Sequence, residues 1–370
     1  MNFDFSEDQK LIQKTARDYL VEHSPLSVCR RVLEGKEHYD AALWKGAAEM
    51  GWLGAAVPEE YGGSGLGHLE LVLIAEEVGR ALAPIPFSSS AVLATETLLL
   101  AGSEAQKKKY LPRLSSGELI GTLAVAEGVG DLLGASPATR IEGGRVTGEK
   151  LPVPDGDAAG LALVLARDGS GASLALVDLG AGGVARTSLE SLDPSRPLAK
   201  LAFSNAPAEI VGAAGKGREL VEKVLDRAAV VMAFEQLGGA QRALEIARDY
   251  AMGRYAFGRP IASFQVLKHR FADLFCAIEL ARSNAFYGAW ALSHGNDELP
   301  LAACGARISA SDAFDLAAKE MIQIHGGVGY TWEYDCHLFY RRAKLLGLTL
   351  GSASEWREKL MARLEAREAA

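Results

Sequence analysis

The sequence lacks the patterns that mark several large classes of protein. It has four cysteines, and the closest two, Cys276 and Cys304, are 28 residues apart. No CxxC pair therefore exists for a zinc or iron–sulfur site or for dithiol chemistry, and we expect unreactive thiols in a reducing compartment and no metal. The longest basic run is the lysine triplet at residues 107–109, and the net charge is −8. Both observations argue against nucleic acid or an anionic membrane as the main partner.

Long apolar runs are also missing. Stretches such as residues 158–166 are far too short to span a bilayer. The first ten residues, MNFDFSEDQK, have neither the basic nor the apolar region of a secretory signal. We therefore expect a cytoplasmic protein. Its 370 residues and 49% hydrophobic content predict a folded chain with more than one domain.

Three patterns follow one another along the chain. Apolar residues recur at helical spacing up to about residue 118, after a predicted capping box formed by Ser6 and Gln9. Short β-type runs broken by glycine, proline and aspartate come next, which favours an antiparallel sandwich or barrel. Helical periodicity then returns. The sequence predicts an N-terminal helical domain (1–118), a central antiparallel β domain (119–212) and a C-terminal helical bundle (213–370).

The most specific motif is RYAFGRPIASFQ at residues 254–265. GGAQRAL at 238–244 precedes it at a helical distance, QIHGGVGY follows at 323–330, and PEEYGG lies at 58–63. These motifs and their order resemble the FAD-dependent acyl-CoA dehydrogenase family over essentially the whole chain. The resemblance implies the helical, β and helical fold of that family.

The resemblance also implies a cofactor site shared between subunits. In the family, FAD lies between the β domain and the C-terminal bundle, and its adenosine and pyrophosphate extend into a neighbouring subunit. A pyrophosphate needs fixed positive charge and backbone donors. Carried over to this sequence, Arg254, Phe257, Gln265, Gly326 and Gly327 would hold the tail of an FAD whose ring belongs to the adjacent chain. Alone, either motif would be a surface charge or a helix cap, but together they favour cofactor contact.

The catalytic base of the family has no counterpart at its usual positions. Members oxidise an acyl-CoA thioester to the 2-enoyl-CoA: a glutamate removes the α proton and the flavin accepts the β hydrogen as hydride. In much of the family this glutamate lies in an EGT-type turn, where this chain has Leu350. In another branch it lies 26 residues before the motif arginine, where this chain has Ala228. Neither side chain can accept a proton, so the base is unassigned.

The β domain departs from the family pattern too. In the TEPGAGSD motif, the threonine that contacts the flavin ring is replaced by Ala126, and the loop that follows is rewritten as EGVGD. In the KxWIT motif, Pro152 and Pro154 replace the tryptophan and the threonine. Proline offers neither an aromatic face nor a donor. The groups that serve the chain's own flavin ring are lost, whereas those for the tail of a neighbour's FAD remain.

This distribution resembles the non-catalytic subunit of heteromeric bacterial acyl-CoA dehydrogenases, such as the steroid side-chain enzymes. It implies a paralogous acyl-CoA dehydrogenase subunit as partner, an acyl-CoA thioester as substrate and an electron-transfer flavoprotein as electron acceptor.

One alternative is an active homo-oligomer with a relocated base. Glu235 is the strongest candidate, because it lies seven residues after Ala228 on nearly the same helix face, about 10 Å further along the axis. A carboxylate in an apolar stripe is more often half of a buried polar pair than a base. Glu127 is a weaker candidate.

Two further alternatives remain open: a flavin-dependent monooxygenase of the same fold, and a protein that binds acyl-CoA without catalysis. His269 and His325 lie near motif residues, but neither has a carboxylate partner at helical spacing that points to a shared site, so we expect hydrogen-bonded structural roles for both.

Overall fold

The computed structural model describes residues 5–130, 132–134 and 136–369; Asp131, part of the rewritten loop, lies outside them. The chain forms two compact units. The helical unit comprises Met1–Arg30, Val72–Ala83 and Ala229–Ala370. The sheet unit comprises Arg31–Leu71 and Pro84–Ala228.

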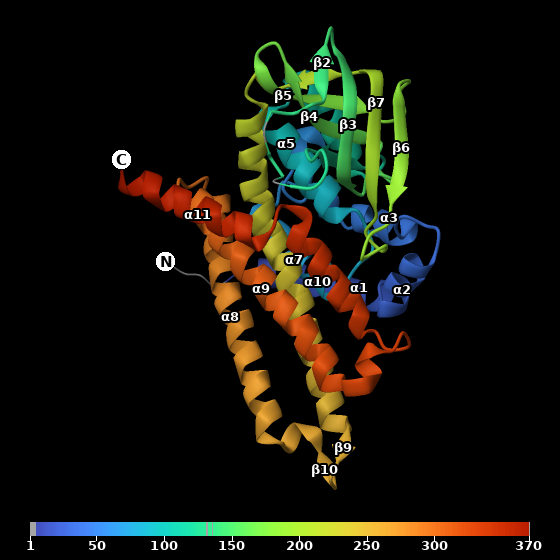
Figure 1. The fold of residues 1–370 in the computed structure, drawn as a ribbon, viewed down its shortest axis with the longest axis vertical. Helices are drawn as coiled ribbons and strands as arrows, with labels where there is room; N and C mark the ends of the chain where they lie inside the picture. The colour runs from blue at the N-terminus through green and yellow to red at the C-terminus, as the bar shows by residue number, and fades with distance from the viewer. Residues whose placement is uncertain (1–4, 131, 135, 370) are drawn as a thin grey trace. The chain divides into compact units, whose positions relative to one another are not determined.

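The helical unit is a bundle of long helices (Figure 1). It contains α1 (Glu7–His23), the end of α4 (His68–Arg80), most of α7 (Gly217–Gly253), β9 (Tyr255–Ala256), β10 (Arg259–Pro260), η4 (Ile261–Ser263), α8 (Gln265–Ser293), α9 (Leu299–His325), η5 (Gly326–Tyr330), α10 (Cys336–Thr349) and α11 (Ala353–Glu368). Helix α9 packs against α8, α10 and α11. It turns mainly alanines inward, and small side chains allow such helices to approach closely.

Two glycines permit the tight crossing of α4 and α7. A Cβ atom added to Gly79 would lie 1.8 Å from the carbonyl oxygen of Glu235, and one added to Gly238 would lie 1.8 Å from that of Glu76. No side chain fits at such distances, so the two backbones meet only because both positions are glycine. This crossing fixes Glu235 in the interior of the helical unit.

The sheet unit surrounds one eight-stranded sheet with the order β6-β7-β3-β2-β4-β5-β8, and β1 pairs with β4. The strands are β1 (Gly121–Ala124), β2 (Arg140–Glu142), β3 (Arg145–Pro154), β4 (Leu161–Asp168), β5 (Gly171–Asp178), β6 (Val184–Leu189), β7 (Leu198–Pro207) and β8 (Glu209–Val211). The helical segments are α3 (Ala41–Glu49), η1 (Trp52–Gly54), η2 (Glu59–Tyr61), the π-helix η3 (Ser88–Ala94), α5 (Thr95–Ala101) and α6 (Glu104–Ser115), with α2 (Leu26–Glu34) crossing between the units along the chain. The first six residues of β4 are buried without alternation, as expected for a strand covered on both faces.

The predicted order of helical, β and helical segments is confirmed: the strands of the eight-stranded sheet begin at Gly121 and end at Val211, and α7 begins at Gly217. The sheet is mostly antiparallel, as predicted, but β1 and β2 both run parallel to β4. The predicted domain limits 1–118, 119–212 and 213–370 remain predictions, since the two compact units divide the chain elsewhere. Among the described residues, no helix is both long and apolar enough to cross a membrane.

Candidate functional site

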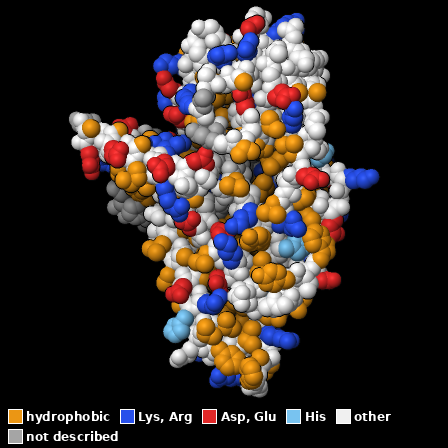
Figure 2. Space-filling model, viewed as in Figure 1, with side chains coloured by type: hydrophobic (Ala, Val, Ile, Leu, Met, Phe, Trp, Pro, Cys, Tyr) orange, Lys and Arg blue, Asp and Glu red, His pale blue; other side chains and the backbone are white. Residues whose placement is uncertain are grey.

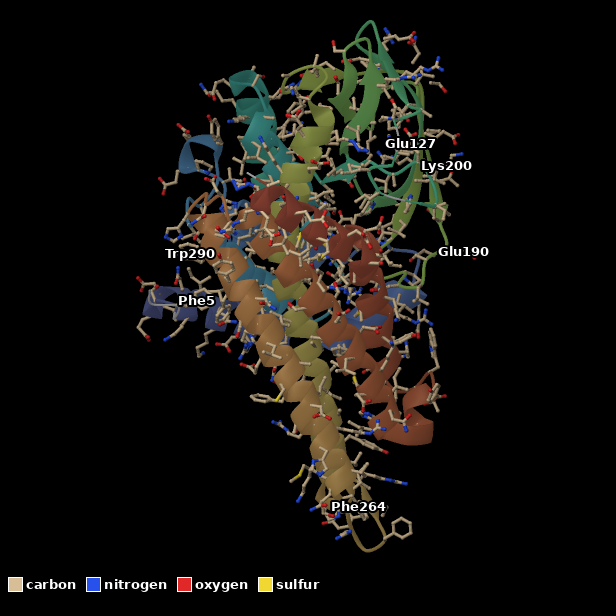
Figure 3. The ribbon with its side chains drawn as sticks, turned by 60° about the vertical axis from the view of Figure 1, so that its left-hand side comes forward. Phe5, Glu127, Glu190, Lys200, Phe264 and Trp290 are labelled. Carbon is tan, nitrogen blue, oxygen red and sulfur yellow. The ribbon has the colours of Figure 1, made fainter. Side chains whose placement is uncertain are left out.

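A short hairpin joins α7 to α8 at one end of the helical unit (Figure 1). Phe257 and Gly258, between β9 and β10, have φ values of 52° and 78°. Two successive positive φ values are what a type I′ turn requires. The turn leaves Phe257 96% exposed. Hydrophobic side chains gather at this end in Figure 2, and Phe264 is labelled there in Figure 3.

Arg254 is fixed by its backbone and free at its side chain. Its N–H donates to the carbonyl of Tyr250, and its own carbonyl accepts from the N–H of Ile261, both at 2.8 Å. Its exposed guanidinium forms no hydrogen bond or ion pair with any described residue. Gln265, also exposed, begins α8 beside this hairpin. A guanidinium in this state offers its charge and five donors to an external anion.

The Gly-Gly turn ends α9. Gly326 adopts φ 63° and ψ −139°, a conformation close to one that only glycine tolerates. A Cβ atom added to Gly326 or Gly327 would meet no described atom within 4 Å. Packing within the chain therefore does not explain glycine at position 327. Without a side chain, the backbone at this position leaves room for an anion to approach, so this turn is compatible with a pyrophosphate.

Tyr250 connects the hairpin to the Gly-Gly turn. It lies one helical turn before Arg254, and its ring stacks on that of His325 with centroids 4.1 Å apart. Its hydroxyl donates to the carbonyl of His325 at 3.4 Å, and Gly326 follows directly. The structure thus brings the Arg254 and Gly326 turns to the same end of the helical unit. Sequence analysis missed Tyr250; its four-residue spacing from Arg254 was the available signal.

The two histidines near the motifs have different environments: His325 is buried and hydrogen-bonded, whereas His269 is exposed. The Nδ1 atom of His325 lies 2.7 Å from the carbonyl oxygen of Met321, and burial lowers the pKa of the imidazole. His269 is exposed on α8.

The rewritten strand region, residues 126–128 and 150–154, uses its polar side chains internally; Figure 3 labels its Glu127. Lys150 is fully buried, and its Nζ donates to Val125 O at 2.9 Å and to Glu127 Oε1 at 2.7 Å. Glu127 also accepts from the N–H groups of Ala138 and Thr139. Burial raises the pKa of Glu127, but these hydrogen bonds outweigh burial and lower it to about 2. A carboxylate this acidic is a poor general base.

Backbone hydrogen bonds also join the two segments of the rewritten strand region. The Leu151 N–H donates to Ala126 O at 2.9 Å, and the Gly128 N–H donates to Leu151 O at 2.8 Å. Pro152 and Pro154 have no N–H, and Thr122 Oγ1 donates to the carbonyl of Pro154. In the family, a flavin ring is contacted by an aromatic face and a side-chain donor, and Pro152 and Pro154 supply neither. These two positions therefore do not offer the ring of FAD the contacts of the family pattern.

The turn at the usual base position is fixed by hydrogen bonds but has leucine where the family has glutamate. Leu350 is buried, and its carbonyl accepts from Trp356 Nε1 at 2.9 Å. Arg307 Nη2 donates to the carbonyl of Leu346 at 2.5 Å and reaches that of Gly351 at 3.5 Å. The scaffold of this turn is intact, while the side chain at position 350 cannot take up a proton.

The second base position and its proposed substitute lie on α7. Ala228 and Glu235 are both buried, and so is Arg307, which donates to Gln236 Oε1 at 3.1 Å. Burial lowers the pKa of Arg307 to about 10, and the charge of Glu235 opposes this shift. The charge of Glu235 thus acts on a buried arginine, which is consistent with the structural role that its apolar surroundings favour.

Comparisons with known proteins identify the family of this chain. The model of the acyl-CoA dehydrogenase N-terminal domain matches residues 6–118, and that of the C-terminal domain matches residues 215–364. Acyl-CoA dehydrogenase IpdE2 of Mycobacterium tuberculosis is 31% identical over 338 residues, which are 91% of each chain. The chain belongs to the acyl-CoA dehydrogenase family. The family is one of FAD-dependent enzymes, so the expected enzyme class and fold are confirmed.

Other acyl-CoA dehydrogenases are similar over the full chain. FadE34 of M. tuberculosis is 34% identical over 366 residues, and the match covers 98% of this chain but 48% of FadE34, so the chain spans about half that relative's length. A chain in the structure of the ChsE4–ChsE5 complex from M. tuberculosis is 28% identical with a TM-score of 0.89. The match covers 99% of this chain and 99% of that one. An acyl-CoA dehydrogenase of Bacillus anthracis complexed with FAD is 27% identical with a TM-score of 0.92, covering 99% of this chain and 68% of that one.

Proposed function

We propose that this acyl-CoA dehydrogenase is the subunit of a heteromer that completes the FAD site of a paralogous subunit. The paralogue supplies the flavin-ring pocket and the catalytic glutamate. The reaction is α,β-dehydrogenation of an acyl-CoA thioester to the 2-enoyl-CoA, and an electron-transfer flavoprotein reoxidises the complex. Bound FAD supplies the hydride acceptor for this chemistry.

One observation carries the proposal: the chain leaves its cofactor-tail groups open and lacks side-chain donors at the positions that contact the flavin ring in the family. Arg254 is exposed and has no side-chain partner among the described residues. The ring positions instead carry Ala126, Pro152 and Pro154, none of which has a side-chain donor. A groove built for its own flavin ring would keep such donors available.

The roles of the chain's own residues follow from this difference. The guanidinium of Arg254 and the open backbone at Gly326 and Gly327 hold the pyrophosphate by charge and hydrogen bonds, and Phe257 and Gln265 flank it. Since Leu350 and Ala228 occupy the two base positions, the α proton goes to a carboxylate of the paralogue.

Two relatives support a heteromeric assembly. ChsE4–ChsE5 is a complex of two components, and this chain shares its fold at 28% identity. FadE34 is about twice as long as the matched segment, so a second unit of this size has room in the same polypeptide.

The competing function is an active homo-oligomer with Glu235 as the base. It would require a carboxylate that is 1% exposed, and whose charge acts on the buried Arg307, to reach the substrate. The burial of Glu235 favours the heteromer.

The test is to purify the full chain alone and together with a paralogue that carries the glutamate of the EGT-type turn. We expect flavin absorbance and acyl-CoA turnover only from the combination. Replacing the paralogue's glutamate with glutamine should abolish turnover of the complex, whereas Glu235→Gln should not. Full flavin loading and turnover by the chain alone would refute the proposal.

A further inference from the structure

The helical unit has a cavity of about 340 Å³ beside His325, the residue that precedes the Gly-Gly turn. Ile246 and Tyr250, one turn apart on α7, line it together with Met321 and His325, one turn apart on α9. Leu26 at the start of α2 closes another side. The volume lies at the lower end of the roughly 300–1,000 Å³ that is typical of small-molecule pockets.

Three aromatic rings form a corner in this cavity. The rings of Tyr250 and His325 stack, with an interplanar angle of 24°. Tyr334 stands edge-on to Tyr250, at 89° and 6.4 Å between centroids, and lies 6.0 Å from His325. Ring faces and ring edges of the protein therefore line the same part of the cavity. This arrangement suits a flat ligand ring that packs by stacking and edge-to-face contact.

His325 contributes a hydrogen-bond acceptor that the protein leaves unused. Only 5% of the residue is exposed, and its Nδ1 lies 2.7 Å from the carbonyl oxygen of Met321. A carbonyl can only accept, so Nδ1 carries the proton and Nε2 has the free lone pair. Burial lowers the pKa of His325, which keeps the ring neutral. No described residue bonds to Nε2, so its lone pair is available to a ligand in the cavity that His325 lines.

The charges at the cavity are already compensated. Asp335 accepts from Arg30 at 2.6 Å, and Asp249 accepts from Arg248 at 2.7 Å. The thiol of Cys336 stays protonated, because burial raises its pKa to about 12. Neither a cation nor an anion would find an unpaired countercharge among the described groups that line the cavity. A neutral ligand fits these surroundings.

We propose that this cavity binds a neutral, planar aromatic molecule with one N–H or O–H donor, of the size of a phenol or an indole. The ring packs in the corner formed by Tyr250 and Tyr334, and the donor bonds to His325 Nε2. A cavity of about 150 Å³ can hold benzene, so this larger one accommodates a bicyclic ring. The site is made by this chain alone and needs neither FAD nor a paralogue.

The direct test compares indole with 1-methylindole, which has the same ring system but no donor, in calorimetric titrations of the full chain. We expect indole to bind roughly five- to tenfold more tightly, the ratio for one net hydrogen bond. Absence of indole binding, or equal affinity for the two probes, would overturn the proposal.

Three variants locate the site. His325→Phe keeps an aromatic ring but removes the acceptor, so the preference for indole should disappear. Ile246→Trp fills the cavity and should remove binding of both probes. Tyr330→Phe changes an exposed tyrosine outside the cavity and should leave both affinities unchanged. A preference that survives in His325→Phe, or binding that survives in Ile246→Trp, would contradict the assignment.

Discussion

Polar groups are arranged in opposite ways in two regions of the molecule. One region is the hairpin and Gly-Gly turns of the helical unit, and the other is the rewritten strand region of the sheet unit. At the turns, the Arg254 side chain is exposed and has no partner among the described residues, and Gly327 is exposed with open space at its Cβ position. In the strand region, Glu127 and Lys150 bond to each other. An unpartnered charge is available to a ligand, whereas paired charges contribute to the fold. Under the proposed function, the chain keeps the half of a cofactor site that serves a neighbour and has lost the family's ring contacts in the other half.

The largest effect is expected where a buried charge loses the opposite charge that acts on it. Glu235→Gln leaves Arg307 buried beside an uncharged amide, which should cost about 3–5 kcal/mol of unfolding free energy in urea titrations. The matched control is Glu219→Gln, also on α7, whose exposed pair with Lys216 contributes about 0–1 kcal/mol. Turnover of the folded complex should be unchanged by either variant. A loss of turnover by orders of magnitude at unchanged stability would make Glu235 the base.

At the open turns, a charge substitution should affect cofactor binding rather than stability. Arg254→Gln removes charge-assisted hydrogen bonds to the pyrophosphate, so FAD should bind the complex roughly 10- to 150-fold more weakly in fluorescence titrations. Arg248→Gln is the control, because this exposed arginine pairs with Asp249 instead. Equal FAD affinities of the two variants would remove Arg254 from the cofactor site.

The two adjacent glycines should separate backbone strain from cofactor contact. Gly326→Ala places a side chain at φ 63° and should destabilise the chain by about 1–3 kcal/mol. Gly327→Ala meets no atom within 4 Å and should leave the melting temperature unchanged while weakening FAD binding by the complex. If Gly327→Ala binds FAD as tightly as the wild type, the open backbone at this position is not a cofactor contact.

The smallest effect concerns the pH dependence of the strand region. The folded-state pKa of Glu127 is about 2, below its ordinary value of 4.5. Its stabilisation is therefore present above pH 4.5 and is lost as the pH falls toward 2. Glu127→Gln should melt below the wild type at neutral pH, and the gap should shrink at about pH 3. A gap that stays constant would show that Glu127 is not held as a carboxylate.

Local signals in the sequence predicted much of the fold. The capping box of Ser6 and Gln9 is present, and the helical periodicity predicted for residues 213–370 corresponds to long helices such as α9, Leu299–His325. Periodicity and capping depend on residues close in sequence, so they can be recognised without a structure. The π-helical turn at Ser88–Ala94 and the parallel pairing of β1 with β4 depend on tertiary packing and escaped prediction.

The candidate site was predicted where motifs carry it and missed where distant residues meet. The positions of Arg254 and Gly326 followed from motifs, but the stacking of Tyr250 on His325 joins residues 75 apart. The pairing of Glu127 with Lys150 joins strand segments 23 residues apart. Asp335 occupies the N-cap of α10, but its carboxylate bonds to Arg30 instead of a helix N–H. A competing partner from a distant segment cannot be read from local sequence.

The flavin content of the purified heteromer tests the central claim most directly. If this chain contributes only the tail-binding half of each site, the complex should contain half as many FAD molecules as chains, and the isolated chain should contain none. As many FAD molecules as chains in the complex, or a fully loaded isolated chain, would contradict the account.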